Sequence, residues 1–161
     1  MVMKRKNWKS YLLWIGLSEA VGIIAGLLTR GGILEFQTGT AQPPFSPPGY
    51  LFPVVWTLLY ALMGVGAARI SLTEASVNRS GGLNLFVVQL AVNFLWPLFF
   101  FNQQAYGFSL LWLLLLWILV LAMIFRFWKT DKTAALLQLP YLLWLSFAIY
   151  LNAGVWLLNR S

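Results

Sequence analysis

Apolar residues concentrate in five stretches of the chain, and the residues between the stretches are richer in polar side chains, Gly and Pro. A membrane-crossing helix needs roughly 20 mostly apolar residues. The predicted spans are residues 11–28, 51–68, 83–101, 108–127 and 136–158. Helices are the economical spanning structure for apolar runs of this length, because they satisfy their own backbone hydrogen bonds. The pattern therefore predicts an all-α membrane protein that folds as a five-transmembrane-helix bundle.

The amino-acid composition agrees with a membrane protein. Of the 161 residues, 60% are hydrophobic and only 9% are charged, whereas soluble domains are about 45–50% apolar and roughly 25% charged. A water-soluble monomer of this size could not hide so much apolar surface. We find no internal repeat and no domain boundary, so the sequence predicts a single transmembrane domain over residues 1–161.

Basic residues fall mainly on one side of the predicted membrane. Nine of the 11 Lys and Arg residues share that side: Lys4, Arg5, Lys6, Lys9, Arg69, Arg79, Arg126, Lys129 and Lys132. The other side holds Arg30 and Arg160. The positive-inside rule then places the N-terminus in the cytoplasm and the C-terminus outside. Membrane orientation explains the net charge of +7 better than a nucleic-acid partner, and we expect a bacterial cytoplasmic membrane and a lipid-bilayer partner.

The first span also has features of a secretory signal peptide, because a basic start precedes its apolar run. The run is about 18 residues long, however, and no small-x-small cleavage site closes it. We therefore expect the first span to be retained as a helix.

A long connection on the outer side joins the first two spans over residues 29–50. Its second half is rich in turn-forming residues: Pro43, Pro44, Pro47, Pro48 and Gly49. Proline favours extended backbone, and long ordered loops are often lids or binding elements. The sequence predicts a semi-rigid lid over the outer mouth of the bundle.

Several aromatic and polar side chains are predicted at similar depth beneath this lid, given a rise of about 1.5 Å per helical residue. These candidate ligand-binding residues are Trp56, Tyr60, Asn93, Trp96, Trp144, Ala148 and Asn152. Lipid-facing amides cost free energy, so Gln89 and the two Asn residues are expected to point into the bundle. An apolar, aromatic cavity with a few polar groups is typical of a ligand pocket. The alternative is that the amides only hydrogen-bond neighbouring helices.

Three further features of the spans leave alternatives open. Glu19 lies in the middle of the first span, where a carboxyl group indicates either a functional acid or an internal structural hydrogen bond. Small residues recur every fourth position at Ser18, Gly22 and Gly26, which suits either internal helix packing or a homodimer. Pro97 and Pro140 lie within predicted spans, where each removes an amide donor and either kinks or tightens the helix.

The residue inventory argues against most enzyme chemistry and against a metal site. The chain has no His and no Cys, which removes the usual general base, thiol catalysis and the commonest metal ligands. Only four acids are present, and none is expected beside a nucleophile. We expect no cofactor and no His-ligated haem.

Three blocks resemble the signature of the TspO/MBR family, the tryptophan-rich sensory or translocator proteins. They are PPFSPPGYLFPVVWTLLYALMG at 43–64, QLAVNFLWPLFFF at 89–101 and PYLLWLSFAIYLNAGVW at 140–156. The resemblance implies a five-helix membrane protein, commonly dimeric, that binds porphyrins in a pocket under the first loop. It places the family's pocket tryptophans at Trp56 and Trp144, a pair implicated in light-dependent porphyrin breakdown in some bacterial members.

The chain departs from the family pattern at a few positions. Phe36 and Gln37 stand where the loop usually carries Trp-Tyr, and Trp112 stands where an acid is often seen. Ala153 and Leu157 replace the Tyr and the basic residue of the animal cholesterol motif, so the resemblance does not extend to cholesterol.

Together these observations predict a membrane receptor, carrier or sensor for porphyrin-like tetrapyrroles or other flat apolar ligands. Trp56 and Trp144 would provide stacking faces, Asn93 and Asn152 would provide hydrogen bonds, and Arg30 would either meet a ligand carboxylate or be a solvated loop charge. Two alternatives stay open. One is light-dependent porphyrin oxidation by the pocket tryptophans, and the other is a regulatory membrane partner without a small ligand.

Overall fold

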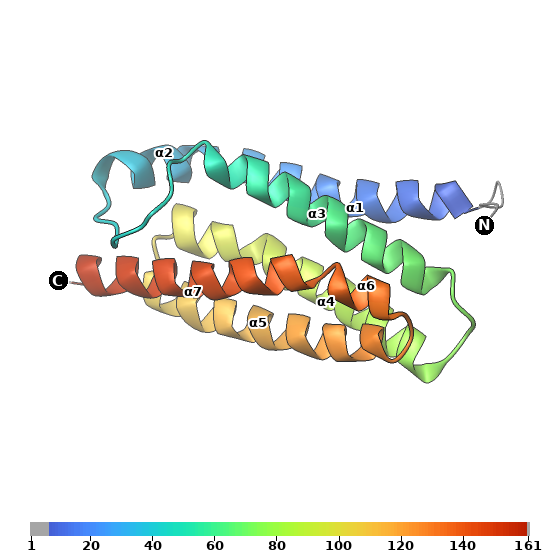
Figure 1. Cartoon of the computed structure of the whole chain (residues 1–161). Coiled ribbons are helices and arrows are strands. Elements are labelled where there is room, and N and C mark those ends of the chain that lie inside the picture. The colour runs from blue at the N-terminus through green and yellow to red at the C-terminus, as the bar shows by residue number, and fades with distance from the viewer. Residues whose placement is uncertain (1–6, 161) are drawn as a thin grey trace.

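The computed structural model describes residues 7–160, and its long helices run side by side as a bundle (Figure 1). The helices are α1 Asn7–Leu28, α2 Arg30–Gly39, α3 Leu51–Ser71, α4 Val77–Pro97, the π-helical turn η1 Leu98–Asn102, α5 Tyr106–Trp128, α6 Lys132–Leu136 and α7 Leu139–Asn159. Within this described range, five segments are long and apolar enough to cross a membrane. The predicted all-α bundle of five transmembrane helices is confirmed.

Most of the long helices extend past the predicted spans at the end of the bundle that holds the N-terminus. The first helix starts at Asn7 and α3 continues to Ser71, while α4 starts at Val77. The side chain of Ser76 caps α4 by accepting a hydrogen bond from the backbone N–H of Arg79 at 3.1 Å. Polar and basic residues continue these helices because long basic side chains reach the polar interface from a helical backbone.

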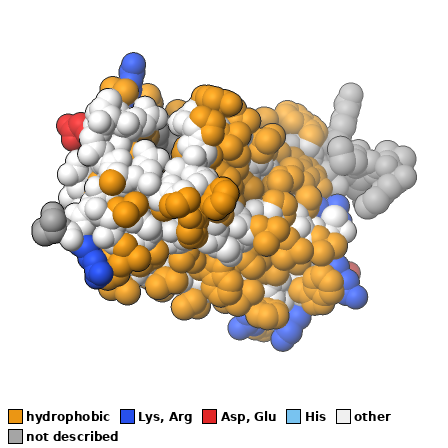
Figure 2. Space-filling model, turned by 60° about the vertical axis from the view of Figure 1, so that its left-hand side comes forward, with side chains coloured by type: hydrophobic (Ala, Val, Ile, Leu, Met, Phe, Trp, Pro, Cys, Tyr) orange, Lys and Arg blue, Asp and Glu red, His pale blue; other side chains and the backbone are white. Residues whose placement is uncertain are grey.

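The two ends of the described chain lie at opposite ends of the bundle (Figure 1), as an odd number of spans requires. Side chains on the face shown in Figure 2 are mostly hydrophobic, with Lys and Arg gathered toward the ends. Lys4, Arg5 and Lys6 lie outside the described residues. The assignment of the N-terminal end to the cytoplasm stays a prediction from the positive-inside rule.

Glycine brings α1 and α3 into direct contact. A Cβ atom added to Gly64 would lie 2.7 Å from the backbone nitrogen of Ile15, and one added to Gly22 would overlap the ring of Tyr60. Small residues on α1 and α3 therefore serve close packing within the chain. A Cβ on Gly16 or Gly26 would meet nothing within 4 Å.

The half of the bundle nearer the start of α1 contains a buried hydrophobic core. Its fully buried side chains include Met63, Phe86, Phe127, Tyr141 and Leu145. They join one hydrophobic cluster to which α3, α4, α5 and α7 all contribute.

The last span differs from the prediction at its start. Asp131 caps the short helix α6 by accepting hydrogen bonds from the backbone N–H groups of Thr133 and Ala134, and its other oxygen pairs with Arg69 at 2.8 Å. The transmembrane helix α7 begins afterwards, at Leu139, with Pro140 in its first turn. Pro140 fits this first turn, where no amide donor is needed, and the helix is interrupted just before it, between α6 and α7.

The connection between the first two long helices is also more structured than predicted. Its first half forms α2 rather than a loop, and only residues 40–50 are irregular. A Cβ on Gly32 would lie 2.7 Å from the backbone of Phe101, so glycine allows α2 to touch η1. The end of α4 becomes a π-helical turn directly after Pro97, which has no N–H to continue the α-helical pattern.

Candidate functional site

A cavity of about 920 Å³ lies in the half of the bundle that residues 29–50 cover. Its walls come from α1, α2, α3, α4, η1 and α7, together with the proline-rich segment that precedes α3. The volume is within the range of small-molecule sites, about 300–1,000 Å³.

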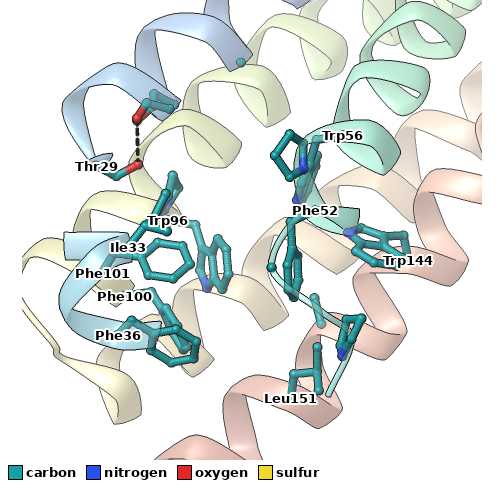
Figure 3. Close-up of a pocket in the computed structure, with 18 of the residues that line it drawn as sticks. Thr29, Ile33, Phe36, Phe52, Trp56, Trp96, Phe100, Phe101, Trp144 and Leu151 are labelled. Carbon is teal, nitrogen blue, oxygen red and sulfur yellow. Dashed lines mark hydrogen bonds between the residues drawn. The ribbon is translucent and has the colours of Figure 1, made fainter. Parts of the chain in front are cut away.

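Two groups of aromatic side chains face each other across the cavity (Figure 3). One group is formed by Phe36, Trp96, Phe100 and Phe101, and the other by Phe52, Trp56 and Trp144. The rings of Trp96 and Phe100 are stacked, with centroids 5.0 Å apart and an interplanar angle of 26°. The rings of Phe52 and Trp144 meet edge to face at 5.9 Å. The cavity therefore has aromatic faces on both sides, which suits a flat apolar ligand.

The position of η1 explains why two consecutive phenylalanines line one wall. Phe36 on α2 packs against Phe100 and Phe101, with both centroid distances at 5.3 Å. A π-helical turn carries more residues per turn than an α-helix, so it changes the faces on which the residues after Pro97 lie. Sequence periodicity predicted the face of Trp96 but gave no signal for the two phenylalanines.

A chain of hydrogen bonds between side chains starts at Tyr60 and Asn93, which line the inner end of the cavity. The hydroxyl of Tyr60 donates to Asn93 Oδ1 at 2.6 Å, and Asn93 Nδ2 donates to the hydroxyl of Tyr141 at 2.7 Å. The hydroxyl of Tyr141 donates in turn to Gln89 Oε1 at 2.8 Å. All four side chains are buried. Gln89 points into the bundle as predicted but lies behind Tyr141, and it is not among the lining residues.

Asn152 holds Trp96 in place. Its Oδ1 accepts hydrogen bonds from Trp96 Nε1 and from the Ser109 hydroxyl, both at 3.1 Å, and its Nδ2 donates to the carbonyl of Tyr106 at 2.8 Å. The carboxamide is fully buried. The amide groups of Asn93 and Asn152 thus lie at the cavity wall while bonding other helices, as the alternative interpretation of these residues expected.

All the candidate ligand-binding residues named from the sequence line this one cavity: Trp56, Tyr60, Asn93, Trp96, Trp144, Ala148 and Asn152. Sequence reasoning did not single out Phe52, Phe100, Phe101 or Thr29 as lining residues. Phe36 and Gln37, noted only as departures from the family pattern, also line the cavity. Arg30 is exposed and is not among the lining residues.

The predicted lid divides into two parts. Pro47, Pro48 and Gly49 line the cavity, whereas Pro43 and Pro44 do not. These two fasten the lid to α7, as two contacts show. Pro43 packs so tightly on Gly154 that a Cβ there would overlap the proline ring, and the carbonyl of Pro44 accepts a hydrogen bond from the Tyr150 hydroxyl at 2.7 Å.

A reciprocal amide contact completes the attachment of the lid. Asn159 Oδ1 accepts from the backbone N–H of Ala41 at 3.1 Å, and its Nδ2 donates to the Ala41 carbonyl at 2.8 Å. We expect Asn159→Ala to raise the rate of amide hydrogen exchange at residues 40–46 about fivefold, because both exposed bonds are lost at once. Mass spectrometry of exchanged peptides measures this. Leu158→Ala is the matched control, and equal exchange in the two variants would contradict this attachment.

Glu19 also lines the cavity, on α1. Among residues 7–160 its carboxyl group has no hydrogen bond and no ion pair. The structure thus gives this side chain no internal hydrogen bond to a described residue. Within the same range, no three His, Cys, Asp or Glu side chains group closely enough to hold a metal ion.

Comparison with known proteins agrees with this architecture. The family model described as the TspO/MBR family matches residues 14–157. The chain is 38% identical over 148 residues to the tryptophan-rich protein TspO of Chlorobaculum tepidum, covering 91% of this chain and 94% of that protein. It is 41% identical over 119 residues to protein CrtK of Rhodobacter capsulatus, at 73% and 74% coverage, and 33% identical over 141 residues to the translocator protein of Bos taurus, at 86% and 83%.

Proposed function

The chain belongs to the TspO/MBR family of integral membrane proteins, and from that premise we propose that it binds porphyrin-like tetrapyrroles or other flat apolar molecules in the cavity under residues 29–50. The protein then acts as a membrane receptor, sensor or carrier. We further propose that the chain folds as a single domain and lies in a bacterial cytoplasmic membrane. Its N-terminus is then in the cytoplasm. Homodimer formation stays a prediction.

The observation that carries this proposal is the pair of facing aromatic walls. Trp96 and Phe100 present one stacked surface, and Trp56 and Trp144 lie across the cavity from it (Figure 3). Aromatic pairs contribute about 0.5–1.5 kcal/mol beyond the area that they bury. A planar macrocycle between the two walls gains such contacts on both of its faces, and a bulky non-planar molecule does not.

The chemistry of the lining supports binding more than catalysis by ordinary acids and bases. The polar atoms of Asn93 and Asn152 already bond other helices. They therefore serve the site mainly by holding Tyr60 and Trp96 in position, and the ligand is bound chiefly by apolar and stacking contacts. This modifies the expectation that the two amides orient the ligand through hydrogen bonds.

A titration with protoporphyrin in the dark tests the proposal. Saturable quenching of tryptophan fluorescence is expected, and the double variant Trp56→Ala, Trp144→Ala is expected to bind about tenfold more weakly because two stacking faces are lost. Trp128→Ala is the control, because Trp128 lies at the end of α5 and is not a lining residue.

The same samples separate the alternatives. New absorbing products that form only under light, and not in the double variant, would favour porphyrin oxidation by the pocket tryptophans. Absence of quenching in the unmodified protein would overturn the proposal and would favour a regulatory membrane partner without a small ligand.

A further inference from the structure

Several polar groups in the cavity wall are already engaged within the chain. The hydroxyl of Tyr60 donates to Asn93, and those of Thr29, Ser46 and Thr57 donate to backbone carbonyls. The Asn152 amide bonds Trp96 and Tyr106. The hydroxyl donors of these groups are thus already used within the chain.

Glu19 is the exception on the α1 wall. Its carboxyl group makes no hydrogen bond or ion pair with any residue from 7 to 160. Gly22, one turn further along the same face, is packed against the ring of Tyr60, so this face of α1 is the face that meets α3. Glu19 is about two and a half turns from the end of α1 at Leu28, and Tyr60 is the same distance from the start of α3 at Leu51.

The charged groups among the described residues that line the cavity are acidic, with no basic counterpart. Glu19 is the one ionisable acid among the described residues that line the cavity, and no Lys or Arg is among them. An unpartnered carboxyl group at membrane depth is costly to desolvate. A ligand that donates a hydrogen bond to it, or that carries a positive charge, removes this cost, whereas a ligand carboxylate at that position adds repulsion.

We infer that Glu19 is a specificity-determining residue, which makes the cavity prefer flat apolar ligands that present an N–H donor or a protonated nitrogen at the depth of Tyr60. Anionic substituents of a ligand then point toward the outer mouth, away from α1. This inference rests on the proposed function, because it concerns the same cavity, and it narrows the ligand class from flat and apolar to flat, apolar and nitrogen-bearing.

Two probes that share one ring system test the inference. 9-Aminoacridine is protonated at neutral pH and acridine is neutral, so the pair differs mainly in charge and N–H donors. The full chain is placed in nanodiscs of zwitterionic lipid, and each probe is titrated by fluorescence against the unmodified protein, Glu19→Gln and Glu74→Gln. The last variant removes the same charge from an exposed residue between α3 and α4, which serves as the matched control.

The unmodified protein is expected to bind 9-aminoacridine about fivefold more tightly than acridine, because a charge-assisted hydrogen bond is stronger than a neutral one. Glu19→Gln is expected to abolish this preference and to change acridine affinity less than twofold, while Glu74→Gln keeps the preference. Equal affinity of the unmodified protein for both probes would overturn the inference, and so would a preference that survives Glu19→Gln or an equal loss for both probes.

Failure of the inference about Glu19 can be told apart from failure of the proposed function, because the two are tested with different probes. If protoporphyrin does not bind but the acridines show the preference that depends on Glu19, the tetrapyrrole proposal fails and the inference about Glu19 stands. If protoporphyrin binds and the preference is missing, the reverse holds. If Glu19→Gln does not fold, the comparison of the two probes on the unmodified protein can still overturn the inference, because equal affinities would contradict it.

Discussion

Replacing Gly64 by Val is expected to separate α1 from α3 and to lower the melting temperature of the purified protein by roughly 10 °C. A Cβ at this position would lie 2.7 Å from the backbone nitrogen of Ile15. A backbone atom cannot rotate aside as a side chain can, so the helices must move apart. Overpacking costs about 1–3 kcal/mol, and about 3 kcal/mol corresponds to this shift for a chain of this length.

The matched control is Gly16→Val, a change of the same chemistry on α1. A Cβ on Gly16 meets nothing within 4 Å, so we expect its melting temperature to stay within about 2 °C of the unmodified protein. Melting followed by circular dichroism in detergent measures both. Equal melting of the two variants would show that α1 and α3 do not pack through Gly64.

Replacing Gly26 by Phe is expected to abolish binding of protoporphyrin while leaving the fold intact. Gly26 lies on α1, lines the cavity, and has open space where a Cβ would be. A phenyl ring grown from this position occupies volume that the ligand needs, without colliding with a neighbouring helix. Because sterically blocked contacts cannot be replaced elsewhere in the site, we expect affinity to fall roughly a hundredfold, about 2.7 kcal/mol.

Gly16→Phe is again the control, since Gly16 lies on α1 but is not among the residues that line the cavity. Both variants should melt near the temperature of the unmodified protein. The dark fluorescence titration should then separate them. Normal protoporphyrin affinity in Gly26→Phe would place the ligand somewhere other than this cavity.

Much of the architecture follows from the sequence because the bilayer imposes a simple rule on it. Runs of about 20 apolar residues must be helices, and the helical repeat then decides which residues share a face. This is why Trp56 with Tyr60, and Trp144 with Ala148 and Asn152, were predicted to line one site, and why all of them line the cavity.

What the sequence does not reveal depends on contacts between distant segments. The helix α2 contains Gly31, Gly32 and Gly39, which read as loop residues, and its apolar side chains Ile33 and Phe36 become partners only once η1 and the cavity exist. Helical propensity is a weak signal beside such tertiary contacts.

The hydrogen bonds of polar side chains also depend on contacts between distant segments, which the sequence does not reveal. Asn93 was predicted at the right depth, yet its hydrogen-bond partners, Tyr60 and Tyr141, come from α3 and α7 and cannot be read from spacing within α4. Whether an amide is available to a ligand depends on these partners. Sequence reasoning could therefore locate Asn93 at the site but left both interpretations of its amide open.

The hydrogen-bonded side chains at the inner end of the cavity also limit the path that a ligand can take through the protein. Tyr60 and Asn93 line its inner end, Tyr141 and Gln89 are hydrogen-bonded behind them, and Met63 and Phe86 are fully buried. Within residues 7–160, these packed side chains separate the cavity from the other end of the bundle. A ligand that binds in the cavity would therefore enter and leave through the same half of the bundle. Its transport between the two faces of the membrane would have to follow the lipid-exposed outside of the protein, not a central pore.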